Sequence, residues 1–435
     1  MLDGLALAVI EKRSPPPSWQ SSFSPPRPRH TRTQTSPPSP PLHLQTPHTH
    51  THTAAPADSA KMTVPPTTKA IVIKSPGHAA IEEVPTPRPR EGYMLVRTLA
   101  VAVNPTDWKH VDLDLPGVSF AGAHSGCDYV GIVEEVGPDA DGDLRPGDRV
   151  AGFAHGGNAS CHEDGAFAHY IVAKAGCATR LPDGVSTPEA ATLGVGVVTV
   201  GQGLFQAIGL PLPDPATAEI RPARPAEDPT ILIWGGSTAT GILGVQFAKL
   251  AGYRVLATCS PRNFDYVRSL GADAVFDYGS PDVAREIREA AAADGGSRVS
   301  AAWDTVVSAD SPRLCAEILG AEGGSYGCLL PVPDAGKVFA VEGARQPIKV
   351  THTLGYTGIG EHFVKWADFP ASKEDYDFAR RFWALARELL AAGKVKAARP
   401  IVDRDGKSGL EGVMAGMQEL KAGRVSGGKL VYTMA

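Results

Sequence analysis

The pattern of apolar and polar positions changes along the chain and predicts two domains of different type. From Lys69 onward, short apolar or alternating runs such as KAIVIK, YMLVRTLAVAV and AFAHYIVAK are separated by glycine and proline turns. Strands at this spacing are typical of a barrel-like all-β domain. After residue 230, strand-like runs alternate with helical patterns, as in TILIWGG followed by ATGILGVQFAKL. This alternation predicts a parallel, doubly wound sheet.

The same patterns predict how the domains are divided. A helix is expected in STPEAATLGVGVVT, because Ser186, Pro188 and Glu189 are typical of a helix N-terminus. A long helical pattern and a last strand-like run, GGKLVYTMA, follow near the C-terminus. If that strand returns to the barrel, the doubly wound domain is an insertion. We expect the first part of the barrel domain in residues 62–199, the doubly wound domain in 200–350 and the completion of the barrel domain in 351–435.

Residues 1–61 differ in composition from the rest of the chain. From Ser14 to Thr53 they are rich in proline, serine, threonine and histidine and almost free of aliphatic residues. Such a segment buries too little apolar surface to offset its chain entropy, which predicts a disordered tail. Three other interpretations stay open: an organelle transit peptide, translation that starts at Met62, and weak metal binding by His48, His50 and His52.

Composition and charge narrow the expected partners and location. The 435 residues are enough for two domains, and the 43% of hydrophobic residues supports full cores. A formal net charge of -5 gives no reason to expect a nucleic-acid or membrane partner. No apolar run approaches the roughly 20 residues needed to span a bilayer. The six cysteines form no C-x-x-C pair, which favours a reducing, cytoplasmic environment.

Residues 231–250, ILIWGGSTATGILGVQFAKL, place a glycine-rich turn between a predicted strand and a predicted helix. The turn is close to the dinucleotide-binding fingerprint G-x-G-x-x-G, with threonine in place of the middle glycine. Gly235 is expected to make the tight turn, and Gly241 to let helix and strand approach closely. Free N–H groups at the helix start attract phosphate. The predicted phosphate-binding residues are Gly235, Ser237, Thr238, Ala239, Thr240 and Gly241.

The end of the next strand indicates which dinucleotide is expected. NAD sites usually carry an acidic residue there that hydrogen-bonds the ribose 2′-hydroxyl. Here the strand is followed by Ser260, Pro261, Arg262 and Asn263. Small hydroxyls and an arginine suit a 2′-phosphate, so NADPH is the predicted cofactor and these four residues are predicted to bind it. Tyr278 lies either near the adenosine phosphate or as an aromatic residue at the sheet edge.

Motifs spread from Lys69 to the C-terminus resemble the medium-chain dehydrogenase/reductase superfamily, and within it the trans-acting enoyl reductases of fungal polyketide pathways. The motifs are NPTDWKH, GCDYVGIV, HGGN, GAFAHY, AATLGVGVVT, GGSTATG, TCSPRNF, LGADAVFDY, TLGYTGIGE and VSGGKLVY. The resemblance implies an α/β protein with a GroES-like β-barrel catalytic domain and a Rossmann nucleotide-binding domain. It also implies a cytosolic monomer or homodimer that uses NADPH to reduce the C=C bond of an α,β-unsaturated acyl thioester, carried by a polyketide synthase carrier domain.

Two other functions remain compatible with these patterns. A zinc-independent quinone or small enone oxidoreductase has the same fold, cofactor and hydride chemistry. A protein of another class, which binds NADPH without catalysis, needs the phosphate-binding turn but no reacting groups. Turnover of a crotonyl thioester and of a quinone distinguishes all three.

The positions that hold zinc in the alcohol dehydrogenases of the superfamily carry other residues here. Those enzymes have a cysteine in a C-x-[ST]-D segment, a G-H-E-x-x-G turn and a later second cysteine. The matching positions in this chain are Asn104, Cys127 and Val195. A catalytic zinc needs three protein ligands, so no metal is predicted and Cys127 is expected to be a small buried turn residue. Other residues of ligand type are interpreted as loop residues: His124, Cys161 and His162.

The resemblance also implies where the reacting groups lie. Lys109 is the predicted catalytic residue that polarises the thioester carbonyl or orients the nicotinamide ribose, although a surface lysine is also compatible with this position. Thr199 is the second predicted catalytic residue and is expected to face cofactor and acyl chain. The remaining predicted cofactor contacts are a loop beside the nicotinamide, formed by Thr106, Asp107, Trp108 and Lys109, and the later residues Cys328, Leu329, Val425 and Ser426.

Two segments of mostly small residues are expected to line the acyl-binding site. Small residues also allow close packing of helices and strands, so a purely structural role stays open for both. The predicted lining residues are Thr192, Leu193, Gly194, Val195, Gly196, Val197, Val198 and Thr199 in the first segment, and Thr353, Leu354, Gly355, Tyr356 and Thr357 in the second.

Overall fold

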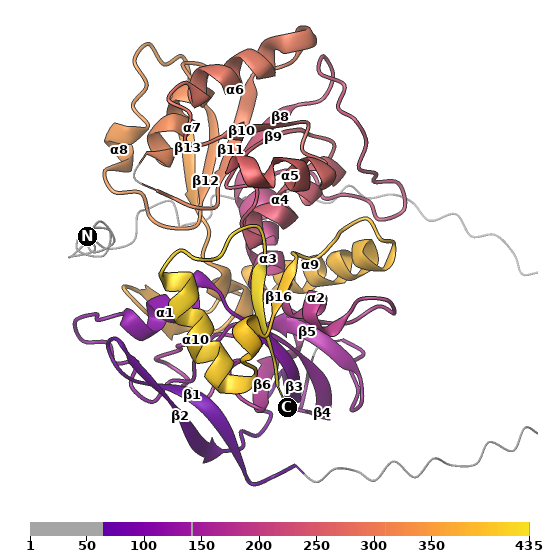
Figure 1. Ribbon diagram of the computed structural model, residues 1–435, viewed down its shortest axis with the longest axis vertical. Coiled ribbons are helices and arrows are strands. Elements are labelled where there is room, and N and C mark those ends of the chain that lie inside the picture. Colours follow the sequence, from indigo (N-terminus) through magenta and orange to yellow (C-terminus); the bar gives the residue numbers. More distant parts are fainter. Residues whose placement is uncertain (1–63, 141, 309, 435) are drawn as a thin grey trace, which may run out of the picture. The chain divides into compact units, whose positions relative to one another are not determined.

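The structure is a computed structural model, and it describes residues 64–140, 142–308 and 310–434. The predicted disordered tail and Met62 lie outside the described residues. From Pro65 onward the described residues belong to one unit. It contains two large sheets, which are built from different parts of the chain (Figure 1).

The first large sheet has seven strands and contains both early and late parts of the chain. The strands pair in the order β16–β17–β3–β4–β5–β7, and β6 also pairs with β3. The last strand, β17, runs antiparallel to β3 with Val431 opposite Ala102, so the C-terminus returns to this sheet. β1 and β2 form a separate hairpin, and an isolated bridge joins Ala70 of β1 to Ala168, two residues before β6. The strands are β1 (Thr67–Ser75), β2 (His78–Pro85), β3 (Tyr93–Ala102), β4 (Asp128–Val136), β5 (Arg149–Phe153), β6 (Tyr170–Lys174), β7 (Ala178–Arg180), β16 (Pro400–Val402) and β17 (Lys429–Thr433).

The second large sheet is parallel throughout and has the strand order β10–β9–β8–β11–β12–β13. Numbered within the domain this is 3-2-1-4-5-6, the order of Rossmann folds, which confirms the predicted fold class. The predicted domain boundary at residue 350 falls inside β13, the last strand of this sheet. The strands are β8 (Thr230–Trp234), β9 (Arg254–Cys259), β10 (Ala274–Asp277), β11 (Val299–Asp304), β12 (Gly324–Cys328) and β13 (Ile348–His352).

Helices cover both faces of the parallel sheet, so the side chains of its central strand β8 are buried on both sides. All five residues of β8 are buried. Ile231 and Ile233 join one hydrophobic core with residues of α4 and α5, whereas Leu232 and Trp234 join another with residues of α6 and α7. An apolar run without alternation is therefore typical of a strand buried on both faces. The helices of this domain are α4 (Ala239–Leu250), α5 (Phe264–Ser269), α6 (Val283–Ala292), α7 (Ser311–Leu319) and α8 (Ala335–Val338).

The remaining helices belong to the first sheet or connect the two sheets. Ser186 begins α2 as predicted, since its hydroxyl accepts a hydrogen bond from the Glu189 N–H. Helix α3 continues directly into η3, a π-helix, so the predicted boundary at 199/200 lies inside one helical segment. The elements are α1 (Pro105–Asp112), α2 (Thr187–Ala191), α3 (Gly194–Val200), η3 (Gly201–Ile208), η6 (Gly355–Ile359), β14 (Phe363–Val364), β15 (Asp368–Phe369), α9 (Lys373–Ala391) and α10 (Gly409–Lys421), with the short turns η2 (Ala175–Cys177), η4 (Pro261–Asn263), η5 (Ala293–Gly295) and η7 (Arg404–Gly406).

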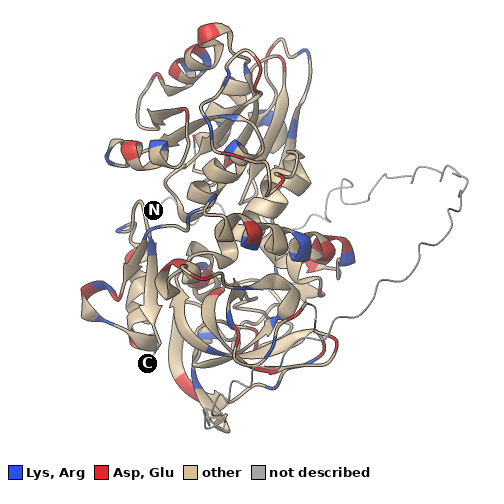
Figure 2. Ribbon diagram, turned by 90° about the vertical axis from the view of Figure 1, so that its right-hand side faces the viewer, with Lys and Arg blue, Asp and Glu red and all other residues tan. Residues whose placement is uncertain are grey.

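Acidic and basic side chains are interspersed over the elements of both sheets (Figure 2), in keeping with the small formal net charge. Within the described part of the chain, no helix is both long enough and apolar enough to cross a lipid bilayer.

Candidate functional site

The glycine-rich turn joins β8 to α4 and is shaped by residues that tolerate no larger side chain. Gly235 has a φ of 84°, a conformation that favours glycine. The Thr238 hydroxyl caps α4 by accepting a hydrogen bond from the Gly241 N–H at 2.9 Å. A Cβ atom on Gly241 would collide with the Gly235 carbonyl oxygen. Gly236, five residues before Gly241, has the fingerprint spacing, and the preceding Gly235 makes the turn.

This turn fits the diphosphate of a nicotinamide dinucleotide. It lies where the strand order reverses between β8 and β11, the place at which open α/β sheets bind ligands. The hydroxyls of Thr238 and Thr305 lie 2.9 Å apart there and join the two strand ends. Ser237, Ala239 and Thr240 are partly exposed beside the start of α4. Backbone N–H groups at this 12-residue helix are suited to phosphate oxygens.

The end of β9 brings together the residues predicted to bind the 2′-phosphate. The Ser260 hydroxyl lies 3.1 Å from the Tyr278 hydroxyl, and Arg262 is exposed on η4. Tyr278 is 52% exposed, so its ring remains accessible to a ligand. Pro261 starts the turn, and Asn263 is directed to another partner, the hydroxyl of Ser426, to which its amide donates at 3.1 Å.

Replacing Arg262 by alanine is expected to weaken NADPH binding by about 1–3 kcal/mol, because a hydrogen bond to the charged phosphate is lost. NADH lacks that phosphate, so its affinity should not change. Titration calorimetry with both cofactors measures the difference, with Arg268→Ala as an exposed control at the next helix. An equal loss for NADPH and NADH would contradict the assignment of Arg262.

The stretch from Thr106 to Lys109, predicted as a loop, is the first turn of helix α1. Pro105 opens the helix, and the Asp107 carboxylate accepts a hydrogen bond from the Asn104 N–H at 2.7 Å. Asp107 is fully buried, and burial raises the pKa of its carboxyl group to about 7. Its carboxylate therefore fixes the start of α1, and its predicted contact with the cofactor stays a prediction.

The other residues of that turn remain near the surface. Thr106, Trp108 and Lys109 are all partly exposed. The Lys109 ammonium lies 5.6 Å from the centre of the Trp108 ring, and Lys421 approaches the same ring at 5.7 Å. A cation near an indole ring is attracted by its electron-rich face. Trp108 thus helps to position the predicted catalytic lysine.

The first predicted acyl-lining segment is held by a buried ion pair. Asp128 accepts a hydrogen bond from the Val195 N–H at 2.6 Å and pairs with Lys429 on β17. A Cβ atom on Gly194 would collide with the Asp128 carboxylate. The Thr192 carbonyl accepts a second hydrogen bond from Lys429 at 3.4 Å. The start of α3 is therefore fixed to β4 and β17 together.

The two predicted lining segments lie side by side, but part of the first segment is core. A Cβ atom on Gly355 would lie 3.6 Å from the Thr199 hydroxyl and 3.3 Å from Val198. Val195, Leu354, Gly355 and Thr357 are partly exposed and remain available to a ligand. The apolar residues Leu193, Val197 and Val198 belong to a hydrophobic core, and buried neighbours of the same segments are Gly196, Thr199 and Thr353.

The four later predicted cofactor contacts lie at the end of β12 and in the segment before β17. Cys328 ends β12, where its thiol donates to the Thr351 carbonyl at 3.3 Å and its carbonyl accepts from the Thr353 N–H at 2.9 Å. Leu329 follows it and is partly exposed. Val425 packs against the core of the first sheet, and Ser426 meets Asn263 of the parallel-sheet domain. The C-terminal segment thus reaches the predicted nucleotide site.

A cluster of buried polar side chains around Tyr356 was only partly predicted. The Tyr356 hydroxyl lies 2.7 Å from the Thr106 hydroxyl and 3.5 Å from the Cys127 sulfur. His155 stacks on the Tyr356 ring with 4.2 Å between ring centres. The Lys365 ammonium lies 4.2 Å from the same ring centre. Sequence reasoning identified Tyr356 and Thr106 but missed the buried His155 and Lys365, together with His110.

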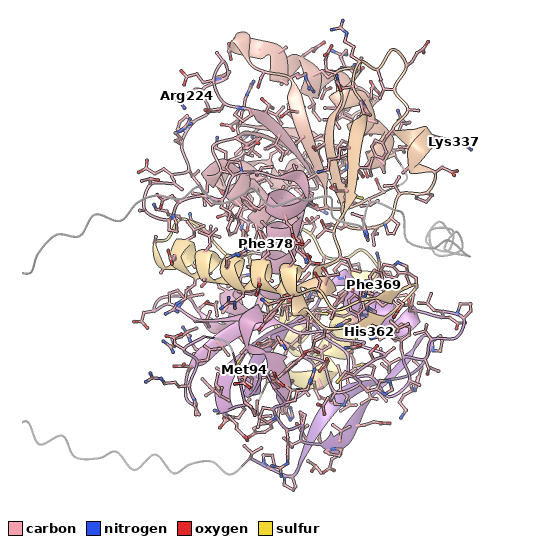
Figure 3. All side chains as sticks on the ribbon, turned by 180° about the vertical axis from the view of Figure 1, so that it is seen from behind. Met94, Arg224, Lys337, His362, Phe369 and Phe378 are labelled. Atoms are coloured by element: carbon pink, nitrogen blue, oxygen red, sulfur yellow. The ribbon has the colours of Figure 1, made fainter. Side chains whose placement is uncertain are left out.

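Lys365 is the most unusual member of this cluster. It belongs to the short segment between β14 and β15, which pair antiparallel with Phe363 opposite Phe369; His362 and Phe369 are labelled in Figure 3. Its side chain is only 2% exposed, and its nitrogen lies 2.5 Å from Nε2 of His110. Burial lowers the pKa of the Lys365 amine to about 7. A lone lysine inside the aromatic run HFVKWADF was the available sequence signal.

Two imidazoles next to Lys365 are neutral at physiological pH. Burial, and then the charge of Lys365, hold the pKa of His110 and of His155 well below the ordinary value. Neutral His110 can therefore accept a hydrogen bond from the ammonium through Nε2. The cluster contains one cation at most, and Lys365 carries it.

The three positions compared with zinc ligands are occupied as follows. Asn104 precedes α1 and is buried, Cys127 is fully buried beside Tyr356, and Val195 lies in α3. Over residues 64–434, apart from the two undescribed positions, no group of three or more histidine, cysteine, aspartate or glutamate residues could hold a metal ion.

Comparison with known proteins relates both domains to known families. Residues 90–183 match the alcohol dehydrogenase GroES-like domain, and residues 239–328 match the zinc-binding dehydrogenase family. The trans-enoyl reductase resD of Aspergillus sclerotiorum is 45% identical over 372 residues, which is 84% of this chain and 99% of that protein. The trans-enoyl reductase ACTTS2 of Alternaria alternata is 44% identical and covers 84% of this chain and 98% of its own length.

Solved structures show the same fold at lower identity. The CurK enoyl reductase has a TM-score of 0.64 at 17% identity and covers 85% of this chain and 99% of its own. The CurF ER cyclopropanase from the curacin A biosynthetic pathway has a TM-score of 0.62 at 22% identity, with 85% and 100% covered.

Proposed function

The chain belongs to the trans-enoyl reductases of the medium-chain dehydrogenase/reductase superfamily, and on that basis we propose that it is an NADPH-dependent enoyl reductase. Its substrate in this proposal is an α,β-unsaturated acyl thioester, presented in trans by a polyketide synthase. The observation that carries the proposal is the 45% identity that extends over nearly the whole length of a trans-enoyl reductase.

The residues at the ends of β8 and β9 support NADPH as the cofactor. The turn from Gly235 to Gly241 holds the diphosphate, and Ser260, Arg262 and Tyr278 hold the 2′-phosphate. When bound, NADPH supplies the hydride that adds to the β-carbon of the acyl chain. The protein's own task is to orient the chain and to stabilise the charge that then develops on the thioester oxygen.

Lys109 is suited to that electrostatic task. It is partly exposed in α1, three residues after Thr106 and close to the Trp108 ring. A cation placed where negative charge develops lowers the energy of the transition state more than that of the ground state. Thr199 and Gly355, which lie side by side, border the acyl chain in this proposal.

Because the proposed substrate arrives on a carrier, we expect the site to have little affinity for a free thioester. An acyl chain tethered to a docked carrier domain has a high effective concentration at the site. Selectivity then depends partly on the docking surface. The reductase acts on the chain while the synthase holds it.

The experiment that tests this function compares three substrates by NADPH oxidation: a crotonyl thioester, a quinone and a small enone. The thioester should be reduced, and Lys109→Ala should lower its kcat by roughly 10²–10³-fold, the range for losing one charge-stabilising group. Thr67→Ala, on the exposed end of β1, is a control that should leave kcat unchanged. Turnover of the quinone alone would favour a quinone oxidoreductase, and no turnover at all would favour a binding protein.

A further inference from the structure

The hydroxyl of Tyr356 is held between two segments of the first sheet domain. It lies 2.7 Å from the Thr106 hydroxyl on α1 and 3.5 Å from the sulfur of Cys127, which directly precedes β4. Thr106 is partly exposed, whereas Tyr356 is 7% exposed and Cys127 is fully buried. The hydrogen bond between Thr106 and Tyr356 therefore joins a partly exposed hydroxyl to a buried one.

The ring of Tyr356 is packed between basic side chains. His155 stacks on it at 4.2 Å between ring centres, and the His110 ring lies at 5.6 Å. The Lys365 nitrogen lies 4.2 Å from the ring centre and 2.5 Å from Nε2 of His110. A cation this close to a phenol ring favours negative charge on the phenol oxygen.

Lys365 is not balanced by an acidic partner. Among the residues that the structure describes, no carboxylate forms an ion pair or hydrogen bond with it. A buried amine that no carboxylate balances is costly to stability, even with the hydrogen bond to His110. Perturbed ionisable groups of this kind are common where a protein uses them in chemistry. If residue 365 only filled space in the core, an apolar side chain would give a more stable protein than lysine does.

The reduction needs a proton as well as a hydride. Hydride addition at the β-carbon leaves an enolate, and the product forms only when the α-carbon is protonated. A donor must therefore stand close to the acyl chain. Tyr356 belongs to the predicted acyl-binding segment, and its hydroxyl lies 2.7 Å from that of Thr106 on α1.

We propose that Tyr356 donates this proton, that Thr106 resupplies it, and that Lys365 is a positioning residue whose charge favours the phenolate. The inference rests on the proposed enoyl reductase function. The electron pair of the enolate forms the new C–H bond at the α-carbon, the Tyr356 O–H bond breaks, and the oxygen keeps its electron pair. The Thr106 hydroxyl then passes a proton from solvent to the phenolate, which restores the phenol.

The acidity of Tyr356 is compatible with this step. Burial, and then the neighbouring Cys127, raise the pKa of Tyr356 well above its ordinary value, so the phenol is fully protonated before the reaction. An enolate of a thioester is a far stronger base than a phenolate. The enolate can therefore take the proton, and the Lys365 charge beside the ring offsets part of the cost of forming a buried phenolate.

The test uses an α-methyl enoyl thioester and the full-length protein with Tyr356→Phe. Wild type should give one configuration at the α-carbon, because a fixed donor protonates one face. The variant should be roughly 10²–10⁴-fold slower, the contribution typical of a general acid, and should give a mixture of α-configurations because solvent supplies the proton. Hydride should still reach the same face of the β-carbon, and NADPH affinity should not change.

Tyr170→Phe, on β6 of the same sheet, removes a phenol hydroxyl elsewhere and is the matched control. If Tyr356→Phe does not fold, Thr106→Val tests the relay instead: it should slow turnover because it interrupts the resupply, while Tyr356 still gives one α-configuration, and an unchanged rate would overturn the relay. Wild type is expected to lose rate as the pH rises through about 7, because Lys365 then loses its charge next to His110, His155, Tyr356 and Cys127. Lys365→Met should lack this pH dependence.

Two results separate the inference from the proposed function. Retention of a single α-configuration and of the wild-type rate in Tyr356→Phe would overturn Tyr356 as the donor while leaving the reductase function intact. A slower hydride transfer with unchanged α-configuration would also overturn it. Absence of thioester reduction in wild type would instead contradict the proposed function.

Discussion

Replacing Lys365 by methionine is expected to stabilise the folded protein at pH 7 by up to about 5 kcal/mol. Burial lowers the pKa of this amine from its ordinary value of 10.5 to about 7, and each pH unit of that difference corresponds to about 1.36 kcal/mol. The unfolded chain binds this proton up to pH 10.5, but the folded chain binds it only below about pH 7. Wild-type stability should therefore gain a rising contribution between pH 7 and 10.5, which the variant lacks.

Urea unfolding of both proteins between pH 6 and 10 measures this effect. The stability advantage of Lys365→Met should be largest at and below pH 7 and should shrink as the pH rises. The same variant should lose activity, which is the pattern expected of a residue kept for function at the expense of stability. A variant less stable than wild type at pH 7 would show that Lys365 is a structural residue.

Replacing Lys429 by methionine is expected to have the opposite effect and to destabilise the protein by about 3–5 kcal/mol. Lys429 is 3% exposed and pairs with Asp128, which is fully buried. Removal of one partner leaves the other as an uncompensated buried charge. Because Asp128 also accepts the Val195 N–H, the start of α3 should loosen as well.

A double-mutant cycle with Asp128→Leu tests this prediction. Removal of both partners should recover much of the loss, since replacing a buried ion pair by apolar residues is often neutral or stabilising. Urea unfolding at pH 7 gives the four stabilities. A loss below about 1 kcal/mol for Lys429→Met, the range of exposed ion pairs, would contradict the buried pairing.

The fold was predictable because its signals are local. One stretch of about 30 residues, the length of a βαβ unit, contains the apolar runs of β8 and β9 and the glycine turn between them. The predicted fold class, the superfamily and the enoyl reductase function are confirmed by the parallel sheet and by the relatives. The capping residues at Ser186 also act locally, so that helix begins as predicted.

The centre of the candidate site was less predictable because it depends on distant contacts. Lys365 meets His110 across 255 positions in sequence, and Tyr356 meets Thr106 across 250. No local sequence pattern predicts that a lysine beside aromatic residues is buried. The family resemblance predicted a loop at residues 106–109, whereas Pro105 and Asp107 are typical of a helix start, which is what the structure has.

The most direct test of the central claim follows deuterium from [4-²H]NADPH into the acyl chain. The same unsaturated acyl group is offered on coenzyme A and on the carrier domain of a fungal reducing polyketide synthase, and the products are analysed by mass spectrometry and NMR. The account predicts a saturated acyl chain with one deuterium at the β-carbon, formed much faster from the carrier domain than from coenzyme A. An unreduced chain on both carriers, under conditions in which a quinone or a small enone oxidises the same NADPH, would contradict it.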